Sequence, residues 1–191
     1  MNDNRQDVIM AGIGGKGVLV AAQILAKAAL GQYTAVSWTP TYYALMRAGA
    51  CECTVVMTNG HLGSPVLSRA RVVVVFEASQ VAAFQNRVAP GGVLLVESAG
   101  LPEVTKTDVR VLRVPAIDIA VGLGDIMAAN FVLLGAYLAV SKAVSKELIE
   151  AELEKRFGQR QKVLDLNLRG LNEGRALVNA MPEIAPSGRG T

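Results

Sequence analysis

The 191-residue sequence predicts a doubly wound α/β fold, with a mostly parallel, Rossmann-like sheet and a helical C-terminal layer. Two observations support this class. In the first half of the chain, short apolar runs alternate with Ala- and Leu-rich segments, as in strand–helix units, and from Ala116 onward the pattern is mostly helical. We expect a single domain over residues 1–180 and a flexible, Gly-, Pro- and Ser-rich tail over residues 181–191.

Six strands are expected, most of them as short apolar or β-branched runs bounded by glycine, proline or a turn dipeptide. They cover residues 7–11, 33–38, 51–57, 72–76, 93–96 and 109–114. Pro40 closes the second strand, and Pro90 with the two glycines after it turns the chain into the fifth. The run from Val72 to Phe76 is continuous, which is typical of a central parallel strand covered on both faces.

Helices are expected between these strands and through the C-terminal third. They cover residues 17–30, 79–88, 116–121, 126–142, 146–157 and 163–178. Ser79, Asp125 and Ser145 are expected to cap three of them, because their side-chain oxygens can accept the free N–H groups of a first turn. The apolar stretch from Ile126 to Val140 is too short to span a membrane, so it predicts a fully buried helix and no membrane association.

The composition limits the classes of function. Apolar residues make up 51% of the chain and charged residues 18%, which predicts that another subunit covers part of the surface. Self-association of the isolated chain would serve the same end. A net charge of +3 without a basic, aromatic-rich run gives no support for nucleic-acid binding. The spacing of Cys51 and Cys53 predicts two reduced thiols on one strand face and, with no apolar signal core at the N-terminus, a cytoplasmic location.

A glycine-rich turn follows the first strand and is the strongest candidate for a binding site. It consists of Gly12, Ile13, Gly14, Gly15, Lys16 and Gly17. Glycines allow the backbone to approach a ligand closely, and the helix that begins here offers free N–H groups and the positive end of its dipole. Because no acidic residue occurs between Asp7 and Glu52, the turn could hold a phosphate, a carboxylate or a carbonyl oxygen.

The turn fits two nucleotide-binding patterns poorly. Dinucleotide binding requires an acidic residue at the end of the second strand, and Ser37-Trp38-Thr39 supplies none. The P-loop spacing fails because Gly17 follows Lys16 directly. An anion site shared with a partner and a purely structural tight turn both stay open.

A self-contained active site cannot be assembled from the residues of this sequence. The only histidine, His61, falls in an expected surface turn and has neither a second histidine nor a nucleophile elbow to accompany it. The cysteine spacing fits no iron–sulfur cluster. We therefore expect no catalytic residue and no metal ligand in this chain, which predicts one subunit of a larger enzyme.

Five sequence blocks, taken in order, resemble a known family over about residues 7–180. They cover residues 11–18, 41–49, 62–66, 114–136 and 165–174. Their order and spacing are similar to those of the gamma subunits of 2-oxoacid:ferredoxin oxidoreductases. Lys16 departs from the pattern because glutamine is usual there. In the 41–49 block Tyr42, Arg47 and Gly49 remain, whereas the usual glycine, proline, glutamate and second glycine are replaced.

This resemblance implies a function for a whole complex. Such complexes oxidise a 2-oxoacid, such as 2-oxoglutarate or pyruvate, with coenzyme A to an acyl-CoA and carbon dioxide, and pass the electrons to ferredoxin. The implied partners are alpha, beta and ferredoxin-like subunits, which hold the thiamine diphosphate, magnesium and iron–sulfur clusters.

The gamma subunit is implied to frame the cofactor cleft and to contact coenzyme A. The residues expected to do so here are Gly12, Gly14, Gly15, Lys16, Gly17 and Arg47. Two alternatives stay open: a stand-alone Rossmann-type nucleotide-binding oxidoreductase, and a diverged scaffold protein without a catalytic role.

Overall fold

The computed structural model describes residues 5–42, 49–100 and 102–181. The described residues form one sheet, whose strand order is β2-β3-β1-β4-β5-β6. The strands are β1 (Gln6–Ile13), β2 (Ala35–Tyr42), β3 (Ala50–Thr58), β4 (Ala70–Val75), β5 (Val88–Glu97) and β6 (Arg110–Val114). Because β1, β4, β5 and β6 run parallel, the predicted α/β class is confirmed. Arg47 and the expected tail after Met181 lie outside the described residues.

The third strand runs antiparallel to both of its neighbours, which the sequence did not predict. β3 lies between β1 and β2, so Val55 pairs with Val8 on one side and Trp38 on the other. A short connection favours this direction, because a parallel neighbour would need a crossover of a dozen or more residues. As a result, β2 does not lie beside β1, where the second strand of a dinucleotide-binding fold would be.

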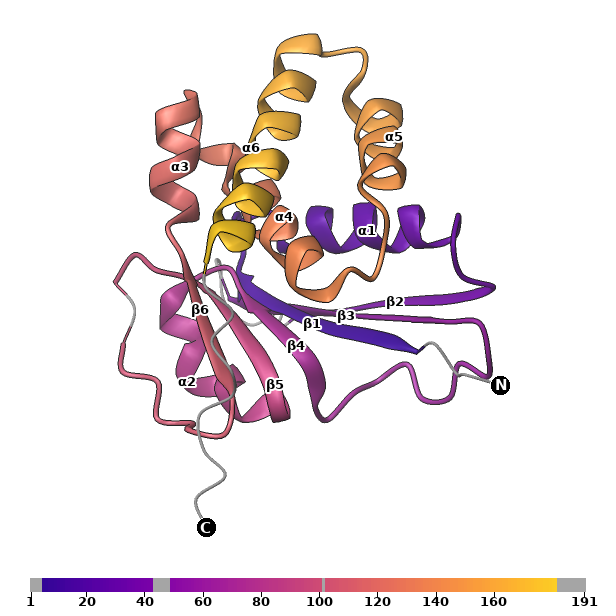
Figure 1. Ribbon diagram of the computed structural model, residues 1–191, viewed down its shortest axis with the longest axis vertical. Coiled ribbons are helices and arrows are strands. Elements are labelled where there is room, and N and C mark those ends of the chain that lie inside the picture. Colours follow the sequence, from indigo (N-terminus) through magenta and orange to yellow (C-terminus); the bar gives the residue numbers. More distant parts are fainter. Residues whose placement is uncertain (1–4, 43–48, 101, 182–191) are drawn as a thin grey trace.

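Helices cover the two faces of the sheet unequally (Figure 1). The main layer contains α1 (Val18–Ala29), α4 (Ala129–Ser141), α5 (Lys146–Phe157) and α6 (Gln161–Ala180). The short α2 (Val81–Phe84), between the 3-10 turns η1 (Ala78–Gln80) and η2 (Gln85–Arg87), lies on the other face. In β4, Val74 packs into the larger core under α1 and α4, and Val73 into the smaller core with α2. This confirms a central strand buried on both faces.

Helices α4 and α6 form the tightest contact within the main layer. A Cβ atom added at Gly135 would lie 2.0 Å from the carbonyl oxygen of Leu171, and one added at Gly174 would lie 1.9 Å from that of Val132. Both obstacles are backbone atoms, which cannot rotate away. The two helices therefore pack backbone to backbone at their crossing, and this contact fixes the position of α4, whose first residues line the pocket described below.

Three expected elements outside the pocket differ in the structure. Pro40 does not end β2, which continues to Tyr42, because an edge strand tolerates a residue without an N–H group. The helix expected over 79–88 is broken into the short pieces named above, and Ser79 lies inside the first of them without capping it. Pro90 and the glycines after it form an irregular part of β5 rather than a turn before the strand.

The cysteines follow the sequence expectation. Cys51 and Cys53 are buried free thiols that lie in the larger core. Burial raises the pKa of the Cys53 thiol to about 12, so this side chain stays protonated and behaves as a small apolar residue.

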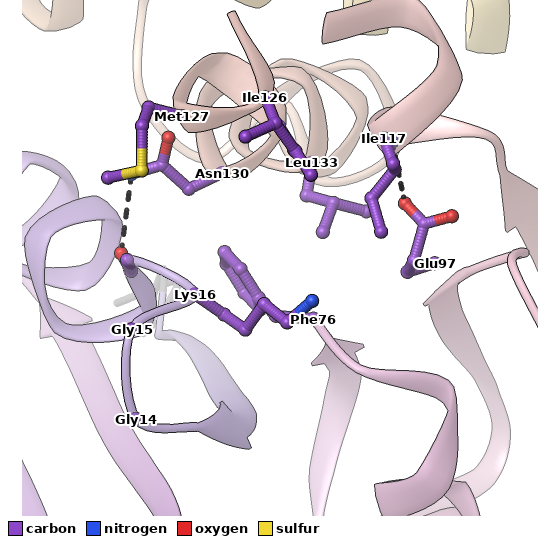
Figure 2. Close-up of a pocket in the computed structure, with 12 residues that line it drawn as sticks. Gly14, Gly15, Lys16, Phe76, Glu97, Ile117, Ile126, Met127, Asn130 and Leu133 are labelled. Carbon is purple, nitrogen blue, oxygen red and sulfur yellow. Dashed lines mark hydrogen bonds between the residues drawn. The ribbon is translucent and has the colours of Figure 1, made fainter. Parts of the chain in front are cut away.

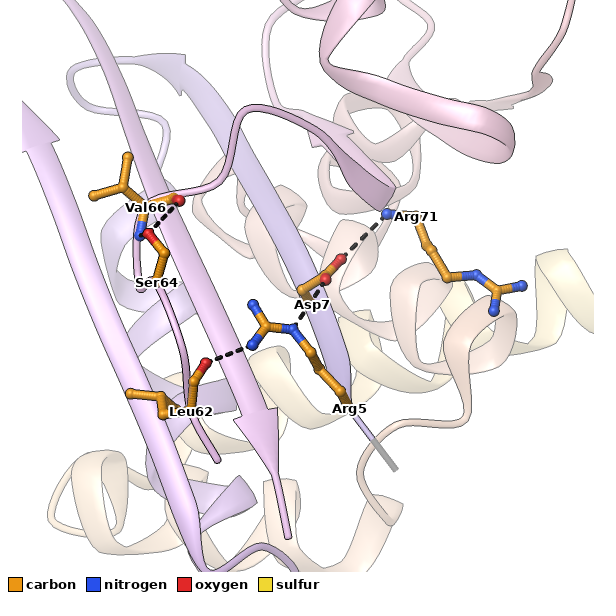
Figure 3. A network of polar contacts seen from close by, with 6 residues as sticks. All are labelled: Arg5, Asp7, Leu62, Ser64, Val66 and Arg71. Carbon is orange, nitrogen blue, oxygen red and sulfur yellow. Dashed lines mark hydrogen bonds and ion pairs between the residues drawn. The ribbon is translucent and has the colours of Figure 1, made fainter. Parts of the chain in front are cut away.

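The loop between β3 and β4 crosses the end of the sheet where β1 begins (Figure 3). The Arg5 guanidinium donates to the carbonyl oxygen of Leu62 and lies 3.7 Å from an Asp7 carboxylate oxygen. A second interaction places the start of β4, because the N–H of Arg71 donates to Asp7 Oδ1 over 3.2 Å. Residues 62–66, one of the blocks that resemble the family, therefore form a surface turn at the end of the sheet opposite to the pocket.

Candidate binding pocket at the carboxyl ends of the strands

A pocket of about 300 Å³ opens where β1, β4 and β5 end (Figure 2). The glycine turn, residues 14–17, forms one wall, and Phe76 follows β4 at its floor. The opposite wall comes from Glu97, from Ile117 of α3 (Ala116–Leu123), and from the segment 126–133, which includes the 3-10 turn η3 (Ile126–Ala128) and the start of α4. Ligands of open α/β sheets bind in this crevice, at the carboxyl ends of the strands.

The glycine turn needs its glycines for different reasons. Gly15 and Gly17 have φ angles of +91° and +73°, in the left-handed region that side chains with a Cβ rarely adopt. Gly12 lies in β1, where a Cβ would meet a Val18 methyl group at 2.9 Å and the Cβ of Phe76 at 3.1 Å. Gly12 therefore serves helix–strand packing. Gly14, Gly15, Lys16 and Gly17 line the pocket itself.

Lys16 is already engaged by a neighbouring carboxylate. Its Nζ atom lies 2.9 Å from Oε2 of Glu77, and both side chains are partly exposed. No described side chain caps α1, so its first N–H groups remain beside the turn without a side-chain acceptor. An anion that enters the pocket would have to compete with Glu77 for Lys16.

Glu97 stabilises the opposite wall, and it was not among the site residues expected from the sequence. It is 2% exposed at the end of β5. Its Oε2 atom accepts from the N–H of Ile117 over 3.0 Å, and its Oε1 atom accepts from the N–H of Ala99 over 2.9 Å. Because both oxygens are occupied, Glu97 caps the first turn of α3 and fixes that helix at the pocket.

Asn130, at the start of α4, contacts the glycine turn from the opposite wall and was likewise not predicted. Its side chain is buried, and Nδ2 donates to the carbonyl oxygen of Gly17 over 3.4 Å (Figure 2). Its Oδ1 atom is buried and has no hydrogen-bond partner among the described residues. An unpaired buried acceptor costs about 1–3 kcal/mol, so a donor group of a ligand would relieve it. Asp125 caps η3 as predicted, through Oδ1 and the N–H of Met127.

The apolar stretch 126–140 was expected to be fully buried, and its first residues correct that expectation. Residues from Asn130 to Leu138 are buried, as expected. Ile126 and Met127, however, are 49% and 63% exposed and form the rim of the pocket. In the part of the chain that the structure describes, no helix is long and apolar enough to cross a bilayer.

The described residues do not fit a resident metal or cluster. Over residues 5–42, 49–100 and 102–181, no three His, Cys, Asp or Glu side chains gather as metal ligands would. Cys51 and Cys53 lie in the apolar core, and His61 lies in a surface turn, where its Nδ1 atom accepts from the N–H of Gly63 over 3.1 Å.

The sheet, the glycine turn and the pocket together define a Rossmann-like α/β fold with a candidate binding site at the carboxyl ends of its strands. The antiparallel β3 beside β1 sets it apart from dinucleotide-binding folds. The sequence profile of the pyruvate ferredoxin/flavodoxin oxidoreductases matches residues 7–177, and the chain belongs to this family.

Individual relatives agree with this assignment. The chain is 34% identical to the ketoisovalerate oxidoreductase subunit VorA of Methanothermobacter thermautotrophicus over 168 residues, 87% of this chain and 35% of VorA. It therefore spans about a third of the length of that relative. The gamma subunit of the keto/oxoacid ferredoxin oxidoreductase from Geobacter sulfurreducens has the same fold, with a TM-score of 0.80 at 24% identity over 92% of this chain and 99% of that one.

A larger enzyme contains the same fold as one part. The 2-oxoglutarate:ferredoxin oxidoreductase from Magnetococcus marinus, solved with 2-oxoglutarate, coenzyme A and succinyl-CoA bound, matches with a TM-score of 0.86 at 22% identity. The match covers 95% of this chain and 32% of that one.

Proposed function

We propose that this chain is the gamma subunit of a 2-oxoacid:ferredoxin oxidoreductase and that its pocket is one wall of the cleft in which coenzyme A takes up the acyl group. The pocket at the carboxyl ends of β1, β4 and β5, walled by the glycine turn, carries this proposal. Family membership supports the reaction class. The names of two relatives specify ketoisovalerate and 2-oxoglutarate, which supports a 2-oxoacid substrate without selecting one.

The pocket lining suits the neutral arm of coenzyme A. Phe76, Ile117 and Leu133 provide apolar walls, while Asn130 offers an unpaired carbonyl oxygen to an amide N–H. The phosphates of coenzyme A need cations or helix N–H groups, and the start of α1 with Lys16 and Arg47 would supply them. In this arrangement the chain binds and orients the acyl acceptor.

The chemistry of decarboxylation is assigned to companion subunits. On those subunits, thiamine diphosphate with magnesium would supply an electron sink for decarboxylation, and iron–sulfur clusters would supply a route for electrons to ferredoxin. We assign these groups to alpha, beta and ferredoxin-like subunits, as the family resemblance implies. This chain then contributes binding energy, position and exclusion of water at its wall of the cleft.

Substitutions of Lys16 and of Glu77, which form an ion pair, are expected to change the KM for coenzyme A in opposite directions. In the assembled complex, Lys16→Ala and Arg47→Ala are each expected to raise the KM for coenzyme A about tenfold, with kcat within about twofold, because each removes roughly 1.4 kcal/mol of anion binding. Glu77→Gln frees Lys16 and is expected to lower that KM. Steady-state kinetics with varied coenzyme A measures all three.

Lys27 provides the matched control because it lies in the last turn of α1, away from the pocket. Lys27→Ala should leave the KM for coenzyme A unchanged. If Lys16→Ala, Arg47→Ala and Glu77→Gln all match the unmodified complex, the proposed contact with coenzyme A is wrong.

A further inference from the structure

Helix α3 consists of apolar residues and glycine except at Asp118, and one face of it is exposed. Asp118 is its one charged residue, and only Ala116 and Ala120 are buried. Val121 is 59% exposed. A helix this rich in apolar residues ordinarily has most of its surface buried. The described part of this chain leaves α3 without a cover on its outer side (Figure 1).

Three large apolar side chains gather at this end of the molecule. Val121, Ile126 and Met127, the α3 patch, account for three of the five large hydrophobic residues that are exposed among the described residues. They come from α3 and η3, which pack against each other. Such a patch marks a surface for another protein. The remaining two, Leu30 and Val66, lie after α1 and in the β3–β4 loop.

The patch is continuous with the pocket. Ile126 and Met127 belong to its lining, and Figure 2 shows them on the helical side, across from the glycine turn. Asp125, the acidic residue beside them, has one carboxylate oxygen engaged in the cap of η3. A protein that covers the α3 patch would therefore also close this side of the pocket and exclude water from it.

The lengths of the relatives indicate what covers it. The matched region makes up 35% of VorA and 32% of the Magnetococcus chain, so about two thirds of each relative consists of further polypeptide joined to this domain. We propose that the α3 patch docks the companion polypeptide that corresponds to the rest of VorA, and that this contact completes the pocket. The inference rests on the proposed function, because it assumes the same complex.

Val121→Asp is the sharpest test, because Val121 lies in the α3 patch but does not line the pocket. The measured quantity is the Kd between the full chain, with and without this substitution, and the purified companion subunit of the same organism. Burying an unpaired carboxylate at the contact is expected to weaken binding at least about 100-fold. The melting temperature of the isolated variant should stay within about 2 °C of the original, since the position is exposed.

Leu30→Asp and Val66→Asp are the matched controls, because they place the same charge at equally exposed apolar positions outside the patch. Both should leave the Kd within about threefold. The docking proposal is overturned if Val121→Asp binds like the original chain, if either control weakens binding as much, or if Val121→Asp disrupts only self-association. A complex that forms normally but lacks coenzyme A-dependent turnover would overturn the proposed function and leave the docking surface in place.

Discussion

Gly174→Ala is expected to lower the free energy of unfolding by about 3 kcal/mol, although alanine is the better helix former. The added methyl group would lie 1.9 Å from the carbonyl oxygen of Val132 and 3.0 Å from the N atom of Ala136. These are backbone atoms of α4, so α4 and α6 would have to separate. Urea unfolding of the isolated chain measures the loss, and the melting temperature should fall by roughly 10 °C.

Gly122 supplies the control with the opposite sign. It lies in α3, and a Cβ there would have no neighbour within 4 Å. Gly122→Ala gains helix propensity without a clash, so it should stabilise the chain by about 0.5–1 kcal/mol. Equal effects of the two substitutions would show that the α4–α6 crossing does not depend on a missing side chain.

Gly17→Ala is expected to reduce kcat/KM for coenzyme A at least about tenfold in the assembled complex. Two costs combine at this position. The φ angle of +73° strains any residue with a Cβ, and the new methyl group would lie 2.4 Å from Nδ2 of Asn130. The strain alone is about 1–2 kcal/mol. The clash pushes Asn130 away from the turn, so the wall of the pocket changes shape.

The contribution of the clash can be separated from that of the strain. Gly15→Ala carries the same kind of strain, at a φ angle of +91°, but its methyl group would point into open space. It should therefore affect turnover less than Gly17→Ala. The clash should also lower the free energy of unfolding of Gly17→Ala, and the double variant Gly17→Ala/Asn130→Ala should recover part of that loss, because it removes the obstructing amide. If Gly15→Ala is as harmful as Gly17→Ala, the contact with Asn130 is not what shapes the turn.

The sequence predicted those parts of the fold that local patterns determine. The run from Val72 to Phe76 identified a central strand, because residues buried on both faces leave no alternation. The direction of β3 was not predictable in the same way. Its residues suit either direction, and only the pairing of Val55 with Val8 and Trp38 shows that it runs antiparallel. Ser79 misled because the helical segment begins one residue earlier than expected, with Glu77 at its N-cap position.

In the candidate site, too, local sequence patterns were predictable and contacts between distant residues were not. The glycine turn was found because its residues are adjacent and follow a strand. Asn130 was missed because it meets Gly17 across 113 residues. Glu97 was missed because its oxygens accept main-chain N–H groups, which leave no trace in the sequence. Met127 was expected in the core, and only the structure shows that it is exposed.

The account depends on this chain being one wall of a shared site. The most direct measurement compares 2-oxoacid-dependent, coenzyme A-dependent reduction of ferredoxin by the purified chain, by the companion subunits, and by the two combined. We predict turnover only in the combined sample, and a KM for coenzyme A that responds to Lys16→Ala. Turnover by the purified chain by itself, or full activity of the companions without it, would contradict the account.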